Sequence, residues 1–271
     1  MNNNTDMAGG GINNLENSTA TIFNCTIVGN TAGDGGGGIA CVKSANVSVA
    51  NTIIWSNSAP VGPDLLVGTA LFSATLTISY SDVLGGLPAV KVNTGSTLNW
   101  GTGMINAVPG FVDPAAGDYH ITATSPCRDG GDSSYSGMPG IDFEDNPRIA
   151  DSAVDIGADE FYERLYQTGI VVPGGGISIK IIGMPGKVAT LALGAGTQDP
   201  PQVTPHGDLH LTLPLAASWN LGQISSDGTR IINATVPLSW VSGEGYPFQA
   251  LIGGWGSVDA KLTNLLVLNV K

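Results

Sequence analysis

The first part of this chain is built from an internal repeat. Gly10-Gly11-Ile12 recurs as Gly37-Gly38-Ile39, an offset of 27 in the numbering. Further pairs keep the same offset: Ile22/Val49, Asn24/Asn51, Thr26/Ile53, Ile27/Ile54, Asn30/Asn57 and Ala32/Ala59. A looser third copy follows at an offset of 29, in which Leu76-Thr77-Ile78 corresponds to Val47-Ser48-Val49. Self-similarity at about 20–50 residues is typical of solenoids, in which each repeat buries its apolar face against the next.

Each repeat has the pattern of short strands separated by tight turns. The run from Thr21 to Val28 is rich in β-branched and aromatic residues and lacks a helical period. Clusters of Gly, Asn, Ser and Asp, such as residues 33–38 and 56–58, supply turns. A leucine-rich repeat is excluded because its leucine pattern is missing, and a propeller blade needs a longer period. We therefore predict a right-handed parallel β-helix over residues 1–162.

Asparagines stand at equal positions of successive repeats, Asn24 with Asn51 and Asn30 with Asn57. Stacked side-chain amides satisfy one another's donors and acceptors along a solenoid axis. We predict such amide ladders here, and an exposed sugar-binding row of amides is the alternative.

Several motifs resemble bacterial right-handed β-helix repeat proteins of cell surfaces. They are Gly-Gly-Gly-Ile (9–12), Asn-Cys-Thr-Ile-Val-Gly-Asn-Thr-Ala (24–32), Asn-Thr-Ile-Ile-Trp-Ser-Asn (51–57) and Tyr-Ser-Asp-Val (80–83). A later stretch is similar to the closing segment of the family often called choice-of-anchor Q proteins, through Pro109–Pro114, Asp118–Ile121, Ser125–Cys127, Asp142–Arg148 and Asp155–Glu160. The resemblance implies the fold but no single activity, because this scaffold carries lyases, hydrolases, adhesins and inert stalks. Arg128 departs from the pattern, in which an apolar residue follows the cysteine.

The character of the sequence changes after Tyr162. Residues 163–176 are predicted as a linker because the run from Val171 to Gly176 is rich in Pro and Gly. Strand-like runs then follow at Ile177–Ile182, Lys187–Leu193, Asp208–Leu213, Thr229–Val236, Pro247–Ile252 and Leu262–Val270. They predict a small antiparallel β-sandwich over residues 177–271 and an all-β chain. Phe248–Ala250 and Leu262–Asn264 resemble a small β-domain that closes many secreted planctomycete-type proteins.

Charge is low and unevenly distributed. Only 12% of residues are charged and Gly numbers 39, as in β-rich extracellular proteins. Residues 1–163 carry 17 acidic and 4 basic residues, a net of −13, whereas residues 164–271 have a net of +1. Nucleic acid is therefore not expected as a partner. No apolar stretch approaches the ~20 residues of a membrane span. We also expect this chain to be part of a longer secreted or cell-surface protein.

The sequence begins in mid-repeat, which would leave an open strand edge. We therefore predict a homo-oligomer, assembled through the first coil or a face near Ile12, Ile22 and Ile39.

The chain has three cysteines, Cys25, Cys41 and Cys127, and they lack the spacing of a metal site. We predict that they are buried thiols. A disulfide between Cys25 and Cys41 is the alternative.

The densest candidate chemistry is an acidic stretch between Asp113 and Glu163, which holds twelve carboxylates and two arginines. Calcium prefers about six to eight oxygen ligands, and the candidate ligands for a calcium ion are Asp142, Glu144, Asp145 and Asp155. A polysaccharide lyase or glycoside hydrolase would draw on a catalytic set of Arg148, Asp142, Glu144 and His120, with Arg148 or Arg128 as the base of a lyase. The alternative is that Arg148 pairs with Asp155 or Glu160 and fixes the final loop.

Histidines give two further candidates. On a strand, His206, Asp208 and His210 would share one face and could bind Zn²⁺ or Fe²⁺, as a metal-dependent hydrolase would require. The alternative is that Pro205 and Gly207 place His206 in a turn and the strand begins near Asp208. His120 has acidic neighbours but no Gly-x-Ser-x-Gly nucleophile motif accompanies it, and the family resemblance implies a structural role for Tyr119-His120.

We therefore expect a non-catalytic extracellular module, either a scaffold or a surface that contacts polysaccharide. The repeat-built surface, the low charge and the lack of a complete catalytic set favour it. Aromatic residues such as Trp55, Trp100 and Trp240 are candidates for sugar stacking or for packing.

Overall fold

The structure, a computed structural model, describes residues 3–144, 146–150, 152–168, 170–204, 207–211, 213, 215–226, 228–253, 261–263 and 266–271. It divides into two compact units. The first contains Met1–Ile121 with Ser125–Phe161, and the second contains Thr122–Thr124 with Tyr162–Lys271.

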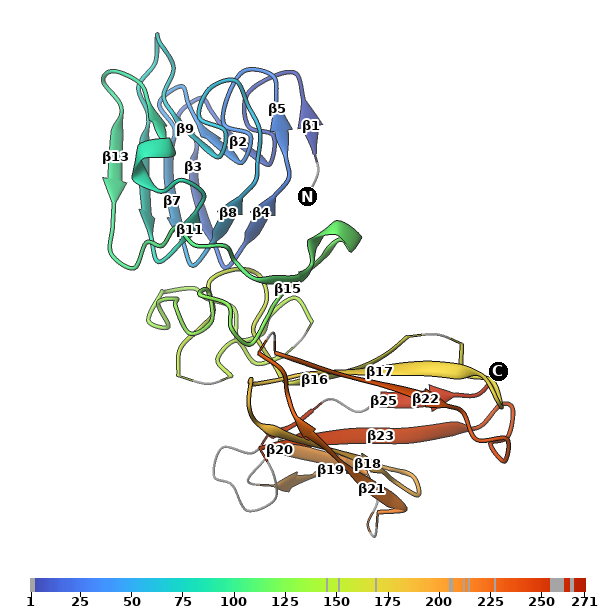
Figure 1. The fold of residues 1–271 in the computed structure, drawn as a ribbon. Coiled ribbons are helices and arrows are strands. Elements are labelled where there is room, and N and C mark those ends of the chain that lie inside the picture. The colour runs from blue at the N-terminus through green and yellow to red at the C-terminus, as the bar shows by residue number, and fades with distance from the viewer. Residues whose placement is uncertain are drawn as a thin grey trace. The chain divides into compact units, whose positions relative to one another are not determined.

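The first unit begins with a β-solenoid whose coils each contribute short strands to the same parallel sheets (Figure 1). The first coil holds β1 (Asn4–Thr5), β2 (Ile12–Asn14), β3 (Thr19–Phe23) and β4 (Thr26–Val28). The second holds β5 (Thr31–Ala32), β6 (Ile39–Cys41), β7 (Asn46–Ala50) and β8 (Ile53–Trp55). The later coils hold β9 (Leu65–Val67), β10 (Thr75–Ser79), β11 (Asp82–Val83), a short 3₁₀ helix at Leu87–Ala89, β12 (Lys91–Val92) and β13 (Thr97–Trp100).

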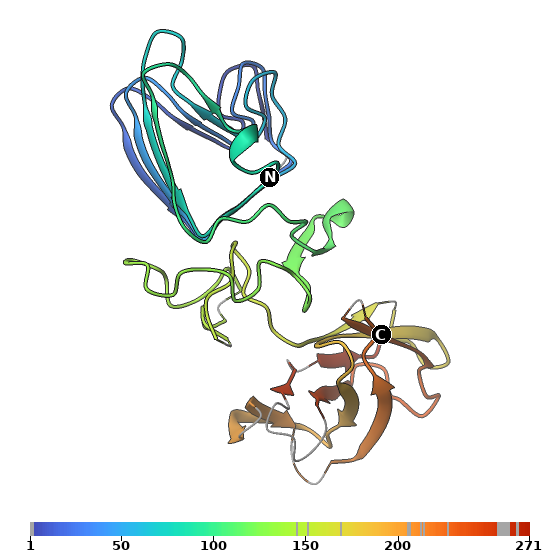
Figure 2. The ribbon, with the colours of Figure 1, turned by 60° about the vertical axis from the view of Figure 1, so that its left-hand side comes forward.

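The register of the sheets follows the sequence repeat. Ile22 of β3 pairs in parallel with Val49 of β7, and Val49 pairs with Ile78 of β10. These pairs reproduce both offsets of the repeat in the sequence. The sheets run in the orders β2-β6-β9-β12, β3-β7-β10-β13 and β4-β8-β11, and successive coils overlap when the unit is turned (Figure 2). The prediction of a parallel β-helix is therefore confirmed.

The solenoid core consists of aliphatic side chains that point inward from every coil. Ile39, Ile54 and Leu76 have no exposed surface. Burying each such side chain contributes about 1.5–3 kcal/mol, so a coil gains stability only when it stacks on its neighbours. Ile22 and Ile39, named above as part of an oligomer face, are 8% and 0% exposed and belong to this core.

The repeated Gly-Gly-Ile motif is explained by close packing between coils. A Cβ atom on Gly37 would lie 2.4 Å from the carbonyl oxygen of Ser58 and 2.5 Å from that of Pro63. On Gly38 it would lie 2.6 Å from the carbonyl oxygen of Asp64. Both positions require glycine because of the neighbouring backbone, and neither has the positive φ that usually selects it.

The predicted amide ladders are present. Asn30 Nδ2 donates to Asn57 Oδ1 at 2.9 Å, and Asn57 Nδ2 donates to Asp64 Oδ1 at 2.8 Å. Asn51 Nδ2 also donates to Asn24 Oδ1, at 3.4 Å. All of these side chains are buried, so the ladders are a structural device and do not form an exposed row.

Residues 125–161, which we call the closing segment, follow a hairpin and lie against one corner of the solenoid. The hairpin pairs β14 (Phe111–Asp113) with β15 (Asp118–Ile121), around a 3₁₀ helix at Pro114–Ala116. The closing segment itself is mostly irregular. Gly157 N donates to Asn51 O at 2.9 Å, and Ala158 N donates to Thr26 Oγ1 at 3.0 Å.

The second unit is built of antiparallel sheets. Its strands are β16 (Arg164–Thr168), β17 (Gly176–Ile182), β18 (Val188–Leu193), β19 (Thr197–Thr204), β20 (Gly207–Leu211), β21 (Ala217–Gln223), β22 (Thr229–Thr235), β23 (Gly245–Ile252), β24 (Lys261–Leu262) and β25 (Leu266–Asn269). They form sheets in the orders β16-β17-β22 and β21-β18-β23-β24, with β25 also on β23, and a β19-β20 pair. Side chains such as Ile179, Ile181 and Phe248 fill the core. The all-β fold class is confirmed.

Some strands of this unit differ from the prediction. Strand β16 lies within the expected linker of residues 163–176, and β19 and β21 fall where no strand was expected. Both missed strands contain irregular pairing: the register shifts between Thr197 and Gln202 within β19, and β21 shifts opposite Ala189 and Thr190 of β18. Prolines or a glycine at such bulges obscure the strand pattern in the sequence.

The three cysteines are free, and Cys41 and Cys127 are fully buried. The expectation of buried thiols is thus confirmed for these two, while Cys25 is partly buried. Among the described residues, no helix is long and apolar enough to cross a membrane.

Candidate functional site

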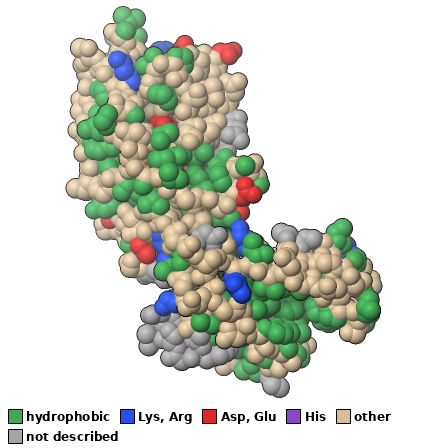
Figure 3. All heavy atoms as spheres, viewed as in Figure 1, with side chains coloured by type: hydrophobic (Ala, Val, Ile, Leu, Met, Phe, Trp, Pro, Cys, Tyr) green, Lys and Arg blue, Asp and Glu red, His purple; other side chains and the backbone are tan. Residues whose placement is uncertain are grey.

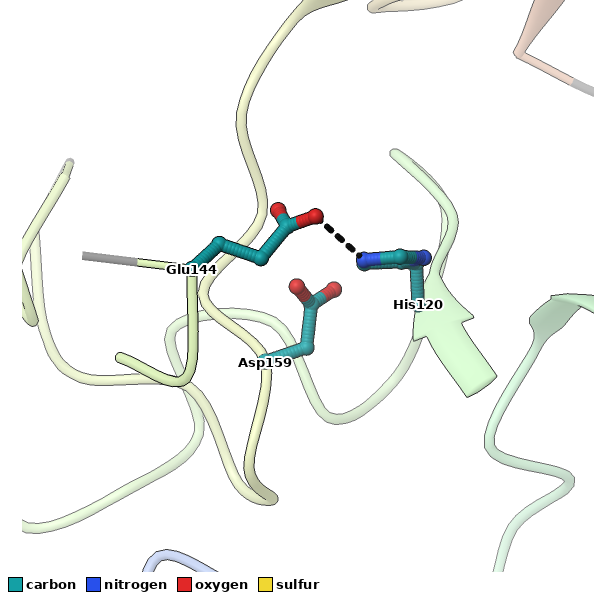
Figure 4. A group of neighbouring side chains, drawn as sticks. All are labelled: His120, Glu144 and Asp159. Atoms are coloured by element: carbon teal, nitrogen blue, oxygen red, sulfur yellow. Dashed lines mark ion pairs between the residues drawn. The ribbon is translucent and has the colours of Figure 1, made fainter. Parts of the chain in front are cut away.

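A group of possible metal ligands lies where β15 meets the closing segment. His120, Glu144 and Asp159 each offer one ligand atom, and these atoms lie within 4.8 Å of one another. The two carboxylates point toward the imidazole ring in the close-up view (Figure 4). Nε2 of His120 is 3.1 Å from Oε1 of Glu144. The group joins one strand residue to two loop residues that are far away in the sequence.

The ring of His120 is held in place by its neighbours. Nδ1 of His120 lies 2.5 Å from Oδ1 of Asp118, and the same oxygen accepts the backbone N–H of His120 at 3.1 Å. Residues i and i+2 of a strand share a face, which is why β15 brings these two side chains together. The ring of Phe143 covers the imidazole at a centroid distance of 5.2 Å.

The group is buried on one side and open on the other. Asp159 is 2% exposed, and its Oδ2 accepts the backbone N–H of Ile121 at 2.8 Å. The Glu144 side chain is 37% exposed. Nε2 of His120 is itself shielded from solvent and has no partner in hydrogen-bonding geometry within the described part of the chain.

Arg148, a candidate catalytic base, belongs to the closing segment, and its side chain is buried. It is 3% exposed. Its guanidinium donates to backbone carbonyls, from Nη1 to Ala158 O at 2.9 Å and from Nη2 to Gly157 O at 3.3 Å and Asn24 O at 3.4 Å. Burial lowers the pKa of Arg148, while the charges of Glu160 and Asp142 raise it. A catalytic base must contact the polymer from which it abstracts a proton. The buried position of Arg148 therefore favours a structural role, in which the guanidinium fixes the final loop.

The carboxylates of Asp142 and Asp155, which belong to the predicted catalytic and calcium sets, accept backbone N–H groups, and both interact with the charge of Arg148. Asp142 Oδ1 accepts the backbone N–H groups of Glu144 and Asn146 at 2.8 and 3.0 Å. The two oxygens of Asp155 accept N–H groups from Asp129 and Phe161, each at 2.6 Å. These carboxylates shape the loops of the closing segment. Asp145 lies outside the described residues.

Burial perturbs the acids of this region. Burial and the carboxylate of Asp155 raise the pKa of Glu160 to about 8, although Glu160 accepts the N–H groups of Ala150 and Asp155. Burial likewise raises the pKa of Asp155 to about 6. Strongly perturbed acids occur both at functional sites and in structural networks, and the hydrogen bonds here favour the structural role.

The predicted metal set of the second unit is not tested by the structure. His206 lies outside the described residues. Asp208 and His210 both belong to β20, and the backbone N–H of His210 donates to Oε1 of Gln249 at 3.1 Å. The Zn²⁺ or Fe²⁺ site of His206, Asp208 and His210 therefore stays a prediction.

A second candidate site is the outer face of the sheet β3-β7-β10-β13, which we call the polar sheet face. The strand registers align its outward residues in two rows, each running across all four strands. The rows are Thr19, Asn46, Thr75, Thr97 and Thr21, Ser48, Thr77, Asn99. All eight side chains are exposed or half-buried, and none is charged. Asn99 Nδ2 donates to Thr77 Oγ1 at 3.0 Å.

Comparison of the sequence with protein families and with curated proteins finds no match. The geometry therefore carries the functional argument. Of the candidate ligands, His120 and Glu144 were expected from the sequence as catalytic residues, whereas Asp159 was not. The spacing of Asp118 and His120 on a strand could have indicated their contact, but nothing in the sequence indicates that Asp159 returns to them.

Proposed function

We propose that this chain is a non-catalytic module of a secreted or cell-surface protein, and that its polar sheet face contacts neutral polysaccharide. The observation that carries the proposal is the pair of rows formed by Thr, Ser and Asn side chains on one parallel sheet. Hydroxyl and amide groups both donate and accept hydrogen bonds, as sugar hydroxyls do.

The dimensions of the face suit an extended polymer. Adjacent strands of a sheet are about 4.8 Å apart, and residues i and i+2 of one strand are about 6.6 Å apart. The polar sheet face therefore repeats its hydroxyls regularly in two directions. The space-filling view shows mostly uncharged surface over the solenoid (Figure 3). An uncharged face favours neutral polymers over uronates, which need a cationic partner.

The proposal also covers the secreted or cell-surface location of the protein and its family. The motifs of the solenoid and closing segment resemble those of choice-of-anchor Q proteins, and Phe248–Ala250 resembles a domain of secreted planctomycete-type proteins. Both resemblances support a secreted or cell-surface protein. The buried position of Arg148 and the absence of a charged group on the polar sheet face favour binding over lyase chemistry.

Co-sedimentation with insoluble neutral polysaccharides, including cellulose, chitin and mannan, tests the proposal. Thr77 is exposed in a central strand of the face, so Thr77→Lys should weaken retention at least about tenfold, or ~1.4 kcal/mol. Asn13→Lys is the matched control, because Asn13 is exposed on a different sheet. The proposal is wrong if no neutral polymer retains the protein, if both variants bind equally well, or if uronate polymers yield unsaturated products.

A further inference from the structure

We propose that His120, Glu144 and Asp159 bind a divalent transition-metal ion of the Zn²⁺ class, and that this ion clamps the closing segment to β15. The three residues already bring their ligand atoms within 4.8 Å of one another (Figure 4). One imidazole nitrogen and two carboxylates are donors that Zn²⁺ accepts. Calcium prefers oxygen ligands alone and a larger number of them, so the site differs from the calcium set expected from the sequence.

Asp118 prepares His120 for metal binding. Nδ1 of His120 lies 2.5 Å from Oδ1 of Asp118, so in the neutral ring a proton shared with Asp118 on Nδ1 leaves the lone pair on Nε2. Histidines that bind metals commonly donate their other N–H to a carboxylate, and this fixes the tautomer and the orientation of the ring. In this protein Nε2 is the nitrogen that faces Glu144.

The spacing of the donors fits one ion. Two ligand atoms at about 2.0–2.1 Å from a tetrahedral Zn²⁺ lie roughly 3.3 Å apart. Nε2 of His120 and Oε1 of Glu144 are 3.1 Å apart. Nε2 is shielded from solvent and has no partner in hydrogen-bonding geometry among the described residues. In the neutral ring the lone pair of Nε2 would face a carboxylate oxygen, and a cation bound to both atoms removes that repulsion; in the protonated ring the same contact is an ion pair, which the metal would replace.

The surrounding charge also favours a cation. The carboxylates of Asp118, Glu144 and Asp159 lie around a single imidazole, and Arg148 compensates the charge of Asp159 only in part because it also interacts with Glu160, Asp142 and Asp155. A bound divalent ion would be the largest local charge and would compensate the carboxylates of the group. Of the three ligands, Glu144 is the most exposed.

The ion would add a second link between β15 and the closing segment, beside the hydrogen bond from the N–H of Ile121 to Asp159. Long stretches of sequence separate His120 from Glu144 and Glu144 from Asp159. The closing segment, which contains both carboxylates, has little regular structure. Binding to the folded state alone stabilises that state by mass action. Three protein ligands also leave one tetrahedral position for water.

Isothermal titration of the EDTA-treated protein with ZnCl₂ tests the inference, with CaCl₂ and MgCl₂ in parallel. We expect one Zn²⁺ per chain, a rise in melting temperature that saturates with it, and no comparable effect of Ca²⁺ or Mg²⁺. His120→Ala and Glu144→Gln should each weaken binding at least about tenfold, since the first removes a ligand and the second replaces a charged ligand with a neutral one. Glu144 is partly exposed, so its variant keeps the fold testable if the histidine variant does not fold.

His210→Ala is the matched control, because His210 belongs to the alternative site predicted in the second unit. It should bind Zn²⁺ as the wild type does. Absorption of the Co²⁺-loaded protein without thiolate charge-transfer bands would exclude the cysteines as ligands. The inference is overturned if no saturable binding occurs, if His120→Ala and Glu144→Gln bind normally, or if His210→Ala abolishes binding. A polysaccharide-binding failure would leave all of these results unchanged, because none of the three ligands belongs to the polar sheet face.

Discussion

Oδ1 of Asp118 accepts hydrogen bonds from both the ring and the backbone of His120, two residues later on the same strand, at 2.5 and 3.1 Å. One carboxylate oxygen thus fixes the orientation of the ring and the position of its strand. Because Nδ1 is engaged, the opposite nitrogen is directed toward Glu144 and Asp159. The chemistry of the whole group depends on this contact.

The first prediction follows from it. Asp118→Ala should weaken Zn²⁺ binding about 10–100-fold, because loss of an orienting partner lets the ring rotate and change tautomer. Asp118→Asn keeps an acceptor for Nδ1–H and should weaken binding less. Titration calorimetry of the two variants checks this order. Equal affinities for both variants and the wild type would show that Asp118 does not position His120.

The second prediction concerns the glycines of the repeat. Gly37→Ala should destabilise the protein by more than about 2 kcal/mol, because its Cβ atom would lie 2.4 Å from a carbonyl oxygen of the next coil. Urea denaturation followed by circular dichroism measures the change. Gly140→Ala is the control: its Cβ atom would meet no other atom within 4 Å, and it should change stability by less than about 1 kcal/mol. Equal effects would contradict the role of coil packing.

The third prediction separates anchoring from catalysis at Arg148. Arg148→Met should destabilise the closing segment by about 3–5 kcal/mol, because it removes a buried cation and leaves nearby carboxylates uncompensated. Lys43→Met is the control, since the ion pair of Lys43 with Glu16 is exposed and should contribute about 1 kcal/mol or less. Proteolysis within residues 125–161 reports on the segment directly. Normal stability of Arg148→Met would contradict the anchoring role.

The solenoid could be predicted from sequence because its contacts are local and repetitive. A residue and its copy in the next repeat occupy the same place in successive coils, so the offset of Ile22 and Val49 is also their pairing register. The packing that requires Gly37 acts between coils in the same way. Strands β19 and β21 were not predicted, because their bulges interrupt the alternation of apolar and polar residues on which strand prediction depends.

The candidate site was predictable only in part. His120 and Glu144 stood out as chemically capable residues in an acidic stretch, but similar carboxylates at Asp142 and Asp155 are used to accept backbone N–H groups. The sequence cannot distinguish a carboxylate that shapes a loop from one that faces a histidine. Asp159 joins the group through an irregular segment whose path has no periodicity, so its position depends on tertiary packing.

The last prediction concerns Asp82, a carboxylate on β11 with no exposed surface. Its Oδ1 accepts the N–H of Ala107 at 3.2 Å, and Oδ2 lies 3.4 Å from Sγ of Cys127. Burial raises the pKa of Asp82 to about 6 despite these hydrogen bonds, whereas an unfolded Asp has a pKa of about 3.9. Between about pH 4 and pH 6 the folded state therefore binds the proton more tightly than the unfolded state, and the stability contributed by Asp82 falls as the pH rises.

Asp82→Asn removes this titration at nearly constant shape. The stability of the variant relative to the wild type should rise between about pH 4 and pH 7, by an amount on the order of 2 kcal/mol. Other buried acids titrate in both proteins, so the difference between the two urea-denaturation curves isolates Asp82. Asp34→Asn, at an exposed position, should give a nearly constant difference over the same range. A constant difference for Asp82→Asn as well would mean that Asp82 is charged in the folded state throughout, and that the hydrogen bonds outweigh its burial.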